Sequence, residues 1–390
     1  MKKSNNALPI SLKSFQVENY AGIIKTSLKD LPDDAQWIFL TGENGFGKTS
    51  VLRAIAIPLR PMEFILDRST EIKNLRITQD IWNKADFETF KLDGSLVIGK
   101  INLNKGPAKR IDLEEFAAYG TSRLEIAHDT SSNEAADKSG RLYSLFRSDG
   151  VLLSAEAEMK VWEKRDSTYF QNLRNTLLKI LDRSIGDIYI DESENAKVKY
   201  VELDKKGNRL PPVNFNQLAS GYRSIVAMIG DLLIRFYKIY PKETPPEEFA
   251  GIVLIDELDV HLHPKMQKKF PGILSKVFPK IQFIASIHSP VPILGAPENA
   301  VFLKVFRTKE EGITVEWLDL VNVQNMTPNT LFSSPIFDFD EIIGDHHDRE
   351  TERLVTEDHY DEAVFTHVLE SKLRKMAKEA NIDPDSILKK

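Results

Sequence analysis

Apolar and polar positions along the chain form short strand-like runs that alternate with longer stretches of helical spacing. Four runs have the length and apolar content of strands, and they span 10–17, 37–40, 251–256 and 281–288. Apolar residues recur at helical spacing in three stretches, which span 50–59, 155–181 and 221–236. Because strands and helices alternate, the pattern predicts an α/β fold with a mostly parallel sheet that helices cover on both faces.

Two central regions have weaker patterns. Residues 85–124 contain further candidate strands and loops, whereas residues 127–140 are polar and predict an exposed loop. Residues 197–211 predict a strand, a turn at Gly207 and Asn208, and a second short strand.

The C-terminal part of the chain differs in composition. Residues 338–362 contain eleven Asp or Glu, two Arg and no Lys, and residues 363–380 have the spacing of an amphipathic helix. We therefore predict a boundary near Pro335, between a domain at 1–335 and an acidic linker with a C-terminal helix at 336–390. The helix is expected to pack on the first domain or to bind a partner protein.

Bulk composition narrows the class of protein. The apolar fraction is 42% and the net charge is -6, so contact with nucleic acid would need a local basic patch. The chain has no cysteine, which excludes disulfides, thiolate zinc sites and thiol nucleophiles. Neither a signal-peptide core nor a membrane-spanning run is found, so we expect a cytoplasmic protein without membrane contact.

A glycine-rich segment joins the strand at 37–40 to the helix at 50–59. It fits the pattern of glycine, four residues, glycine, lysine, then serine or threonine, and consists of Gly42, Glu43, Asn44, Gly45, Phe46, Gly47, Lys48, Thr49 and Ser50. Glycines let backbone N–H groups point into one concavity, and the following helix adds the positive end of its dipole. Lys48 is expected to reach the β- and γ-phosphates of ATP, and Thr49 to coordinate Mg²⁺. The alternative is a turn that fits the pattern by chance.

Two carboxylates, Asp256 and Glu257, end the predicted strand that begins at Gly251. The C-terminal edge of such strands is where open α/β sheets bind ligands. Asp256 is expected to hold Mg²⁺ through water, and Glu257 to orient or deprotonate the attacking water. The alternative is an ordinary acidic turn after a strand.

Two further segments carry a resemblance to a known superfamily. The segment QLASGYRSIVAMIGDLL at 217–233 resembles the signature of ATP-binding-cassette (ABC) ATPases, and His288 in FIASIHSP lies where that superfamily places its switch histidine. Together with ENGFGKTS and DELDVHLHP, these segments resemble the non-transporter branch that includes RecF, SMC and OLD-type ATPases. The set looks closest to stand-alone ATPases encoded beside nucleases in antiphage systems such as Septu, PARIS and retrons. The resemblance spans about residues 10–305.

This resemblance implies a P-loop NTPase fold of the ABC type, with an antiparallel β portion and a helical insertion at about 125–215. It also implies a homodimer or higher oligomer whose heads enclose ATP. Ser220 and Gly221, at a helix N-terminus, would bind the γ-phosphate of the nucleotide that the other copy's Lys48 loop holds. Asp259 would begin the D-loop, and His288 would sense the γ-phosphate.

The match is incomplete in places. The family order is leucine, serine, glycine, glycine, whereas here Ala219 stands at the serine position and Ser220 follows. Taken alone, the segment also fits an ordinary helix start with a serine N-cap, and His288 fits a structural histidine. The family's Mg²⁺-binding glutamine has only Gln79 as a candidate. Arg123, in AYGTSR, either reaches a phosphate or merely follows a glycine-containing turn.

Several hypotheses follow for the function. The first is an ATP-hydrolysing switch that dimerises head to head and regulates a partner effector, a nuclease in antiphage defence. The alternatives are a DNA-repair or chromosome-maintenance ATPase that binds DNA, and a scaffold that binds ATP without hydrolysing it. In the tail, His346, His347, Asp348 and His359 suggest a metal site, but their spacing favours a solvated acidic loop.

Overall fold

The computed structural model describes most of the chain up to residue 318. The described residues are 7–59, 72–83, 88–97, 100–103, 113–124, 126–127, 138–165, 167–181, 184–194, 196–241, 243–318, a few residues between 326 and 337, and Arg374. The chain divides into two compact units, Met1–Asp340 and Glu341–Lys390. Apart from Arg374, which is helical, the predicted acidic linker, C-terminal helix and tail histidines lie outside the described residues.

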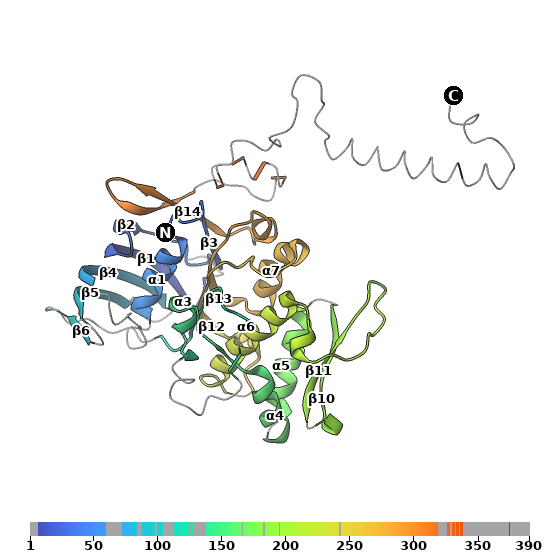
Figure 1. Ribbon diagram of the computed structural model, residues 1–390. Coiled ribbons are helices and arrows are strands. Elements are labelled where there is room, and N and C mark those ends of the chain that lie inside the picture. The colour runs from blue at the N-terminus through green and yellow to red at the C-terminus, as the bar shows by residue number, and fades with distance from the viewer. Residues whose placement is uncertain are drawn as a thin grey trace. The chain divides into compact units, whose positions relative to one another are not determined.

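The first unit is built on one mixed sheet (Figure 1). In the described part of the chain it has eleven strands in the order β6-β5-β4-β1-β2-β15-β14-β3-β13-β12-β7. The last five are mutually parallel, and they are β14 (Val301–Thr308), β3 (Trp37–Thr41), β13 (Lys280–Ser286), β12 (Ala250–Ile255) and β7 (Phe116–Tyr119). Because β3, β13, β12 and β7 run in one direction, their C-terminal ends meet at one edge of the sheet.

The remaining strands form the antiparallel portion of the sheet. They are β1 (Ile10–Tyr20), β2 (Ile23–Leu28), β4 (Ile72–Asn83), β5 (Glu88–Val97), β6 (Lys100–Leu103) and β15 (Gly312–Trp317). β15 pairs with both β14 and β2, and so joins the two portions. The parallel strands flanked by helices and the antiparallel portion are both as predicted.

Helices cover both faces of the parallel strands, and each face has its own core. Ile38 and Leu40 of β3 point into a cluster with α1 (Lys48–Leu59) and α3 (Tyr143–Phe146). Trp37 and Phe39, which alternate with them, point into a cluster with α4 (Ala155–Arg165), α5 (Ser167–Ile180), α6 (Ser220–Tyr237) and α7 (Pro264–Val277). Such two-sided burial explains why β3, β12 and β13 are continuous apolar runs.

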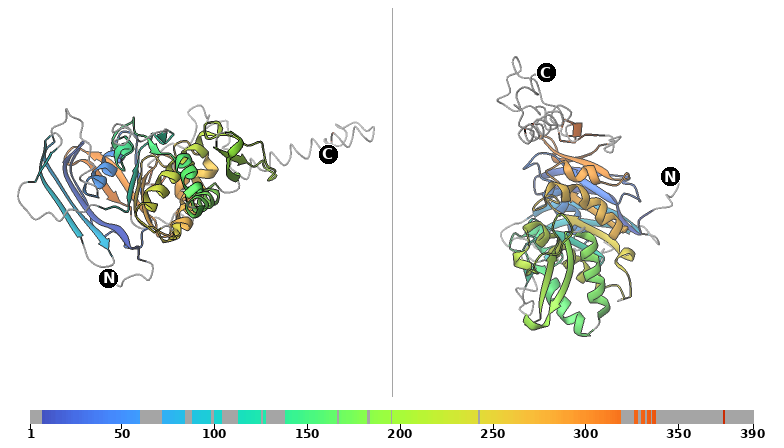
Figure 2. Two further views of the ribbon diagram at one scale, coloured as in Figure 1. Left: turned by 90° about the horizontal axis from the view of Figure 1, so that it is seen from below. Right: turned by 90° about the vertical axis from the view of Figure 1, so that its right-hand side faces the viewer.

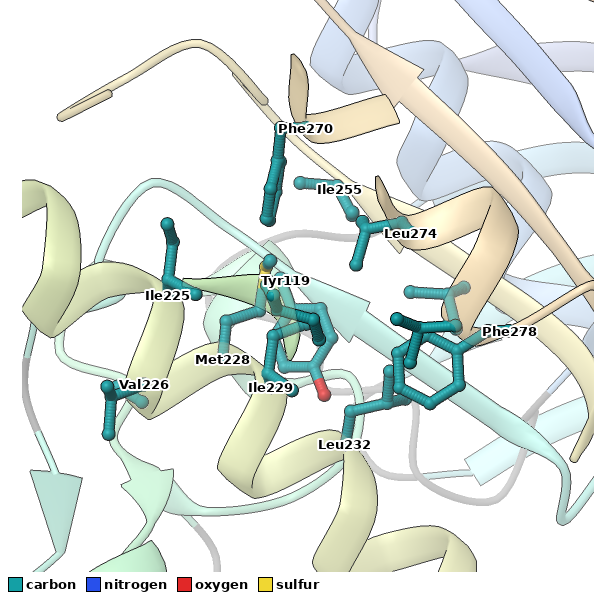
Figure 3. Close-up of a cluster of buried hydrophobic side chains, with 14 of the residues drawn as sticks. Tyr119, Ile225, Val226, Met228, Ile229, Leu232, Ile255, Phe270, Leu274 and Phe278 are labelled. Carbon is teal, nitrogen blue, oxygen red and sulfur yellow. The ribbon is translucent and has the colours of Figure 1, made fainter. Parts of the chain in front are cut away.

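Helix α6 is anchored by the second of these cores. Figure 3 shows its residues Ile225, Met228 and Leu232 among Tyr119 of β7 and residues of α7. Almost every residue of α6 from Ser224 onward is buried. The N-terminus of α6 is therefore held in a defined place relative to the sheet.

The region predicted as a helical insertion contains α4 and α5 and then a hairpin. Here β10 (Ile185–Asp191) pairs antiparallel with β11 (Lys197–Glu202). The short strands β8 (Ile126–Ala127) and β9 (Leu152–Leu153) pair with each other in parallel. In Figure 2, left, these green helices and the hairpin lie at the opposite end of the unit from the blue antiparallel strands.

The predicted strand at 197 and the turn at Gly207 are found, but the second short strand after the turn forms only as isolated bridges. β11 pairs along its length with β10, which precedes it. After the turn, Arg209 bridges to Leu203 and Val213 bridges to Tyr200 of β11. Pro211 and Pro212 explain the difference, because proline has no N–H to continue a ladder.

Among the described residues, no helix combines the length and apolar character needed to cross a membrane.

Candidate nucleotide-binding site

The glycine-rich segment forms a tight loop between β3 and α1. Gly42 and Gly47 have φ angles of 126° and 97°, which residues with side chains rarely adopt. A Cβ atom on Gly42 would lie 2.1 Å from the carbonyl oxygen of Val305, so the loop also needs glycine for its close approach to β14. Glu43, Asn44 and Gly45 are exposed at the tip.

Lys48 lies at the centre of this loop. Its side chain is buried, and Nζ donates hydrogen bonds to the carbonyl oxygens of Gly42 at 2.7 Å and Glu43 at 3.1 Å. Burial lowers the pKa of Lys48, while the carboxylates of Asp256, Asp259 and Glu257 act in the opposite direction. The ammonium is thus held by loop carbonyls that a phosphate oxygen can replace as its partner.

Asp256 follows β12 and is linked to both neighbouring elements. Its Oδ2 accepts a hydrogen bond of 2.8 Å from the hydroxyl of Thr49, at the start of α1. Its Oδ1 accepts one of 2.6 Å from the hydroxyl of Ser286, at the end of β13. The predicted pair of Thr49 and Asp256 is therefore brought together by the packing of β3, β13 and β12, whereas Ser50 lies in the first turn of α1.

Thr49 and Asp256 fit a Mg²⁺ ion. Their oxygens are hard donors, and Mg²⁺ in nucleotide sites commonly takes one or two protein ligands beside substrate phosphates. Within the described part of the chain, no group of three or more His, Cys, Asp or Glu side chains could hold a metal by itself. A metal at this edge would thus depend on Thr49, Asp256 and the phosphates together.

Glu257 lies next to Asp256 in an unusual backbone conformation, with φ of 50°. Its amide donates to the hydroxyl of Ser286 at 2.7 Å, and its carbonyl oxygen accepts from Nη2 of Arg123. The carboxylate is partly exposed, and its Oε1 lies 3.4 Å from Nε2 of His288. Glu257 and His288 therefore form an accessible acid–base pair beside the Lys48 loop.

Asp259 has a role within the chain. Its carboxylate accepts hydrogen bonds from the backbone amides of His288 and Ser289, the latter at 2.9 Å. Asp259 thereby fixes the turn that presents the imidazole of His288. Its predicted contact with nucleotide stays a prediction.

Ser220 and Gly221 begin α6 and line a different pocket. This pocket of about 640 Å³ is bounded by the start of α6, by the loop at His261 to His263 and by the first turns of α7. No residue of the loop from Gly42 to Thr49 lines this pocket.

Two residues that sequence reasoning missed or left open complete the site. Ser286 joins Asp256 to Glu257 through one hydroxyl, but nothing in its sequence context pointed to it. Arg123, which had two equal interpretations, is 2% exposed and lies among Asp256, Glu257 and Asp259. Gln79 lies in β4, which pairs with β1 and β5.

The fold is the predicted one, a mostly parallel sheet flanked by helices, with a glycine-rich loop after β3 and two carboxylates after β12. The family model described as "AAA domain, putative AbiEii toxin, Type IV TA system" matches residues 107–292, which include Asp256, Glu257 and His288.

Parts of the chain are similar to two curated proteins. It is similar to the Septu protein PtuA of Bacillus mycoides (strain KBAB4), with 25% identity over 301 residues that cover 73% of this chain and 38% of the relative. The Retron Vc95 probable ATPase of Vibrio cholerae serotype O1 biovar El Tor is 29% identical over 187 residues, which cover 46% of this chain and 36% of the relative. The chain thus spans well under half the length of both relatives.

The solved structures that this chain is similar to include an Smc head domain and the recombination mediator protein RecF. One is the Smc head domain of Pyrococcus furiosus bound to the C-terminal domain of ScpA, with a TM-score of 0.48, 12% identity, and coverage of 80% of this chain and 97% of that one. The other is RecF, with a TM-score of 0.42, 14% identity, and coverage of 81% and 100%.

Proposed function

We propose that this protein is an ATP-hydrolysing switch that dimerises head to head and regulates a partner effector, a nuclease, in antiphage defence. The observation that carries the proposal is the cluster at the sheet edge, where Lys48, Asp256 and Glu257 lie together. A buried lysine in a glycine-rich loop suits polyphosphate, and a carboxylate beside it suits the attacking water.

The geometry supports a sequence of events in hydrolysis. Lys48 exchanges its carbonyl partners in the loop for phosphate oxygens, which places the γ-phosphoryl group beside Glu257. Thr49 and Asp256 would hold Mg²⁺, which would neutralise charge on the phosphates. Glu257 then orients or deprotonates the attacking water, and His288, 3.4 Å away, contacts the transferred group.

The position of Ser220 and Gly221 supports the dimer. They line a pocket at the start of α6 that no residue of the loop from Gly42 to Thr49 lines in the same chain. In the head-to-head arrangement the N-terminus of α6 of one copy faces the γ-phosphate in the other copy, where N–H groups and the helix dipole favour the anion. ATP thus holds two copies together, and hydrolysis releases them.

The defence role is supported by the similarity to Septu PtuA and to retron ATPases. Because the chain matches only part of each relative, the existence of a partner effector is itself part of the proposal for this chain. A nuclease encoded in the neighbouring reading frame is the partner we expect.

A mixing experiment tests the composite site. Lys48→Ala and Ser220→Arg should each abolish turnover alone. Lys48→Ala removes the ammonium group that binds phosphate, and Ser220→Arg obstructs the N-terminus of α6. Ser220 is exposed, so the arginine should not disturb folding. Gly221 is unsuitable, because an added Cβ would lie 2.8 Å from the carbonyl oxygen of His261. Mixing the two variants should restore turnover through one intact composite site per heterodimer, whereas an inactive mixture would refute the arrangement.

A further inference from the structure

Arg123 is a buried cation that the proposed reaction does not yet use. It lies four residues after the end of β7, at the edge of the sheet where the C-terminal ends of β7 and β12 meet. Its side chain is 2% exposed, which is rare for arginine because removing a guanidinium from water is costly. Such burial needs compensation from nearby charges and hydrogen bonds.

The compensation comes from residues that follow the C-terminal end of β12. Nη2 of Arg123 donates to the carbonyl oxygen of Glu257, and the carboxylates of Asp256, Asp259 and Glu257 surround the group. Burial lowers the pKa of Arg123 to about 10, so the guanidinium remains charged at neutral pH. Its Nε atom is buried and has no hydrogen-bond partner among the described residues. Within that part of the chain, the side chain is therefore held by the peptide of Glu257 and by charge.

The peptide that Arg123 holds is the strained one. Glu257 has φ of 50°, a conformation that residues with side chains rarely adopt unless their surroundings impose it. Three contacts hold this peptide: the hydroxyl of Ser286 accepts from its amide, and its carbonyl oxygen accepts from Nη2 of Arg123 and, at 3.1 Å, from the amide of Val260. The Val260 contact lies within the same turn, so Arg123 ties the carbonyl end of Glu257 to a different part of the chain, the segment after β7.

We infer that Arg123 is a positioning residue for the hydrolytic reaction, which fixes the backbone of Glu257 so that its carboxylate faces the attacking water. The inference rests on the proposed function. Arg123 acts through Glu257 and makes no contribution to the capture of ATP, which depends on the Lys48 loop.

Steady-state kinetics of Arg123→Gln test this role. We expect kcat to fall by about a hundredfold, the loss typical of a misplaced catalytic group, while the Kd for a non-hydrolysable ATP analogue changes by less than about threefold. Arg123→Lys keeps the charge but loses the planar fork, so it should recover part of kcat. Thermal unfolding of each variant shows whether it is folded. If Arg123→Gln does not fold, Arg123→Lys carries the same test of kcat against Kd.

A matched control and a double variant sharpen the result. Arg141 also donates to backbone carbonyls, those of Glu114 and Phe116, but at the other end of β7. Arg141→Gln should therefore leave kcat unchanged. In a Glu257→Gln background, Arg123→Gln should cause no further loss in single turnovers of radiolabelled ATP.

The failures are distinguishable. Equal losses of kcat and ATP affinity would show that Arg123 binds phosphate, and an unchanged kcat would show that it only supports the fold; either result overturns the inference. Absence of turnover in the unaltered protein would instead overturn the proposed function.

Discussion

The hydroxyl of Thr49 donates a hydrogen bond of 2.8 Å to Oδ2 of Asp256, which lies 207 residues away in the sequence. The contact joins the start of α1, which follows β3, to the end of β12, because β3 and β12 pair with β13 on its two sides. It brings the two predicted Mg²⁺ ligands together, and the predictions below depend on this arrangement.

Lys48→Ala should weaken ATP binding by about a hundredfold or more, since a charge-assisted contact to phosphate is lost. Isothermal titration with a non-hydrolysable analogue measures this loss. Lys276, an exposed lysine on α7, provides the control variant Lys276→Ala, which should bind as the unaltered protein does. Equal affinity in Lys48→Ala would refute the assignment of the phosphate site.

Ser286→Ala should lower both the free energy of unfolding and kcat, whereas a matched control should lower only the former. The change leaves the Glu257 amide and Oδ1 of Asp256 without their shared partner, which should cost about 1–3 kcal/mol of unfolding free energy and at least about tenfold in kcat. Ser275, which accepts from Trp37 and donates to Pro271 on α7, is the matched control. Ser275→Ala should lose stability in urea unfolding but keep kcat. Equal kcat in both variants would contradict the role of Ser286.

Asp231→Ala should be strongly destabilising. Asp231 is fully buried and accepts hydrogen bonds from Tyr119, from Arg235 and from the amide of Leu153. Its loss removes the carboxylate that pairs with the buried guanidinium of Arg235, which typically costs about 3–5 kcal/mol. The control is Glu247→Ala, which breaks an exposed pair with Lys179 and should cost less than about 1 kcal/mol. Similar unfolding free energies for the two variants would count against this network.

The parts of the site that could be predicted are those whose chemistry lies in contiguous residues. The loop from Gly42 to Thr49 and the pair Asp256 and Glu257 each follow an apolar run, so sequence spacing alone places them at a strand end. The strands at 37–41 and 250–255 were predicted to within one residue for the same reason.

The parts that could not be predicted depend on which strands become neighbours. Ser286 acts on Asp256 only because β13 packs beside β12, and a serine in a strand carries no signal of that contact. The second short strand predicted after the Gly207 turn is reduced to isolated bridges, whereas the pairing of β11 with β10, which no local signal indicates, buries Ile188 and Val198 in the core.

Acid should destabilise the protein partly through His261. Burial, followed by the charges of Arg123 and Arg223, lowers the pKa of His261, so the folded state binds its proton less readily than the unfolded chain does. Unfolding free energy should therefore fall as pH drops below the ordinary histidine pKa, from about pH 7.5 to about pH 5.5. His261→Asn, which tolerates the φ of 68° at this position, should make that fall smaller in urea titrations at both pH values. An identical fall in both proteins would exclude this contribution.

The mass of Glu257→Gln in the presence of ATP tests the central claim most directly. This variant should bind ATP but hydrolyse it slowly, so light scattering after size exclusion should give twice the chain mass of 44.4 kDa with Mg²⁺ and ATP. Without nucleotide, or with Lys48→Ala added, it should give the mass of one chain. A Glu257→Gln protein that is saturated with ATP and still has the mass of a single chain would contradict the account.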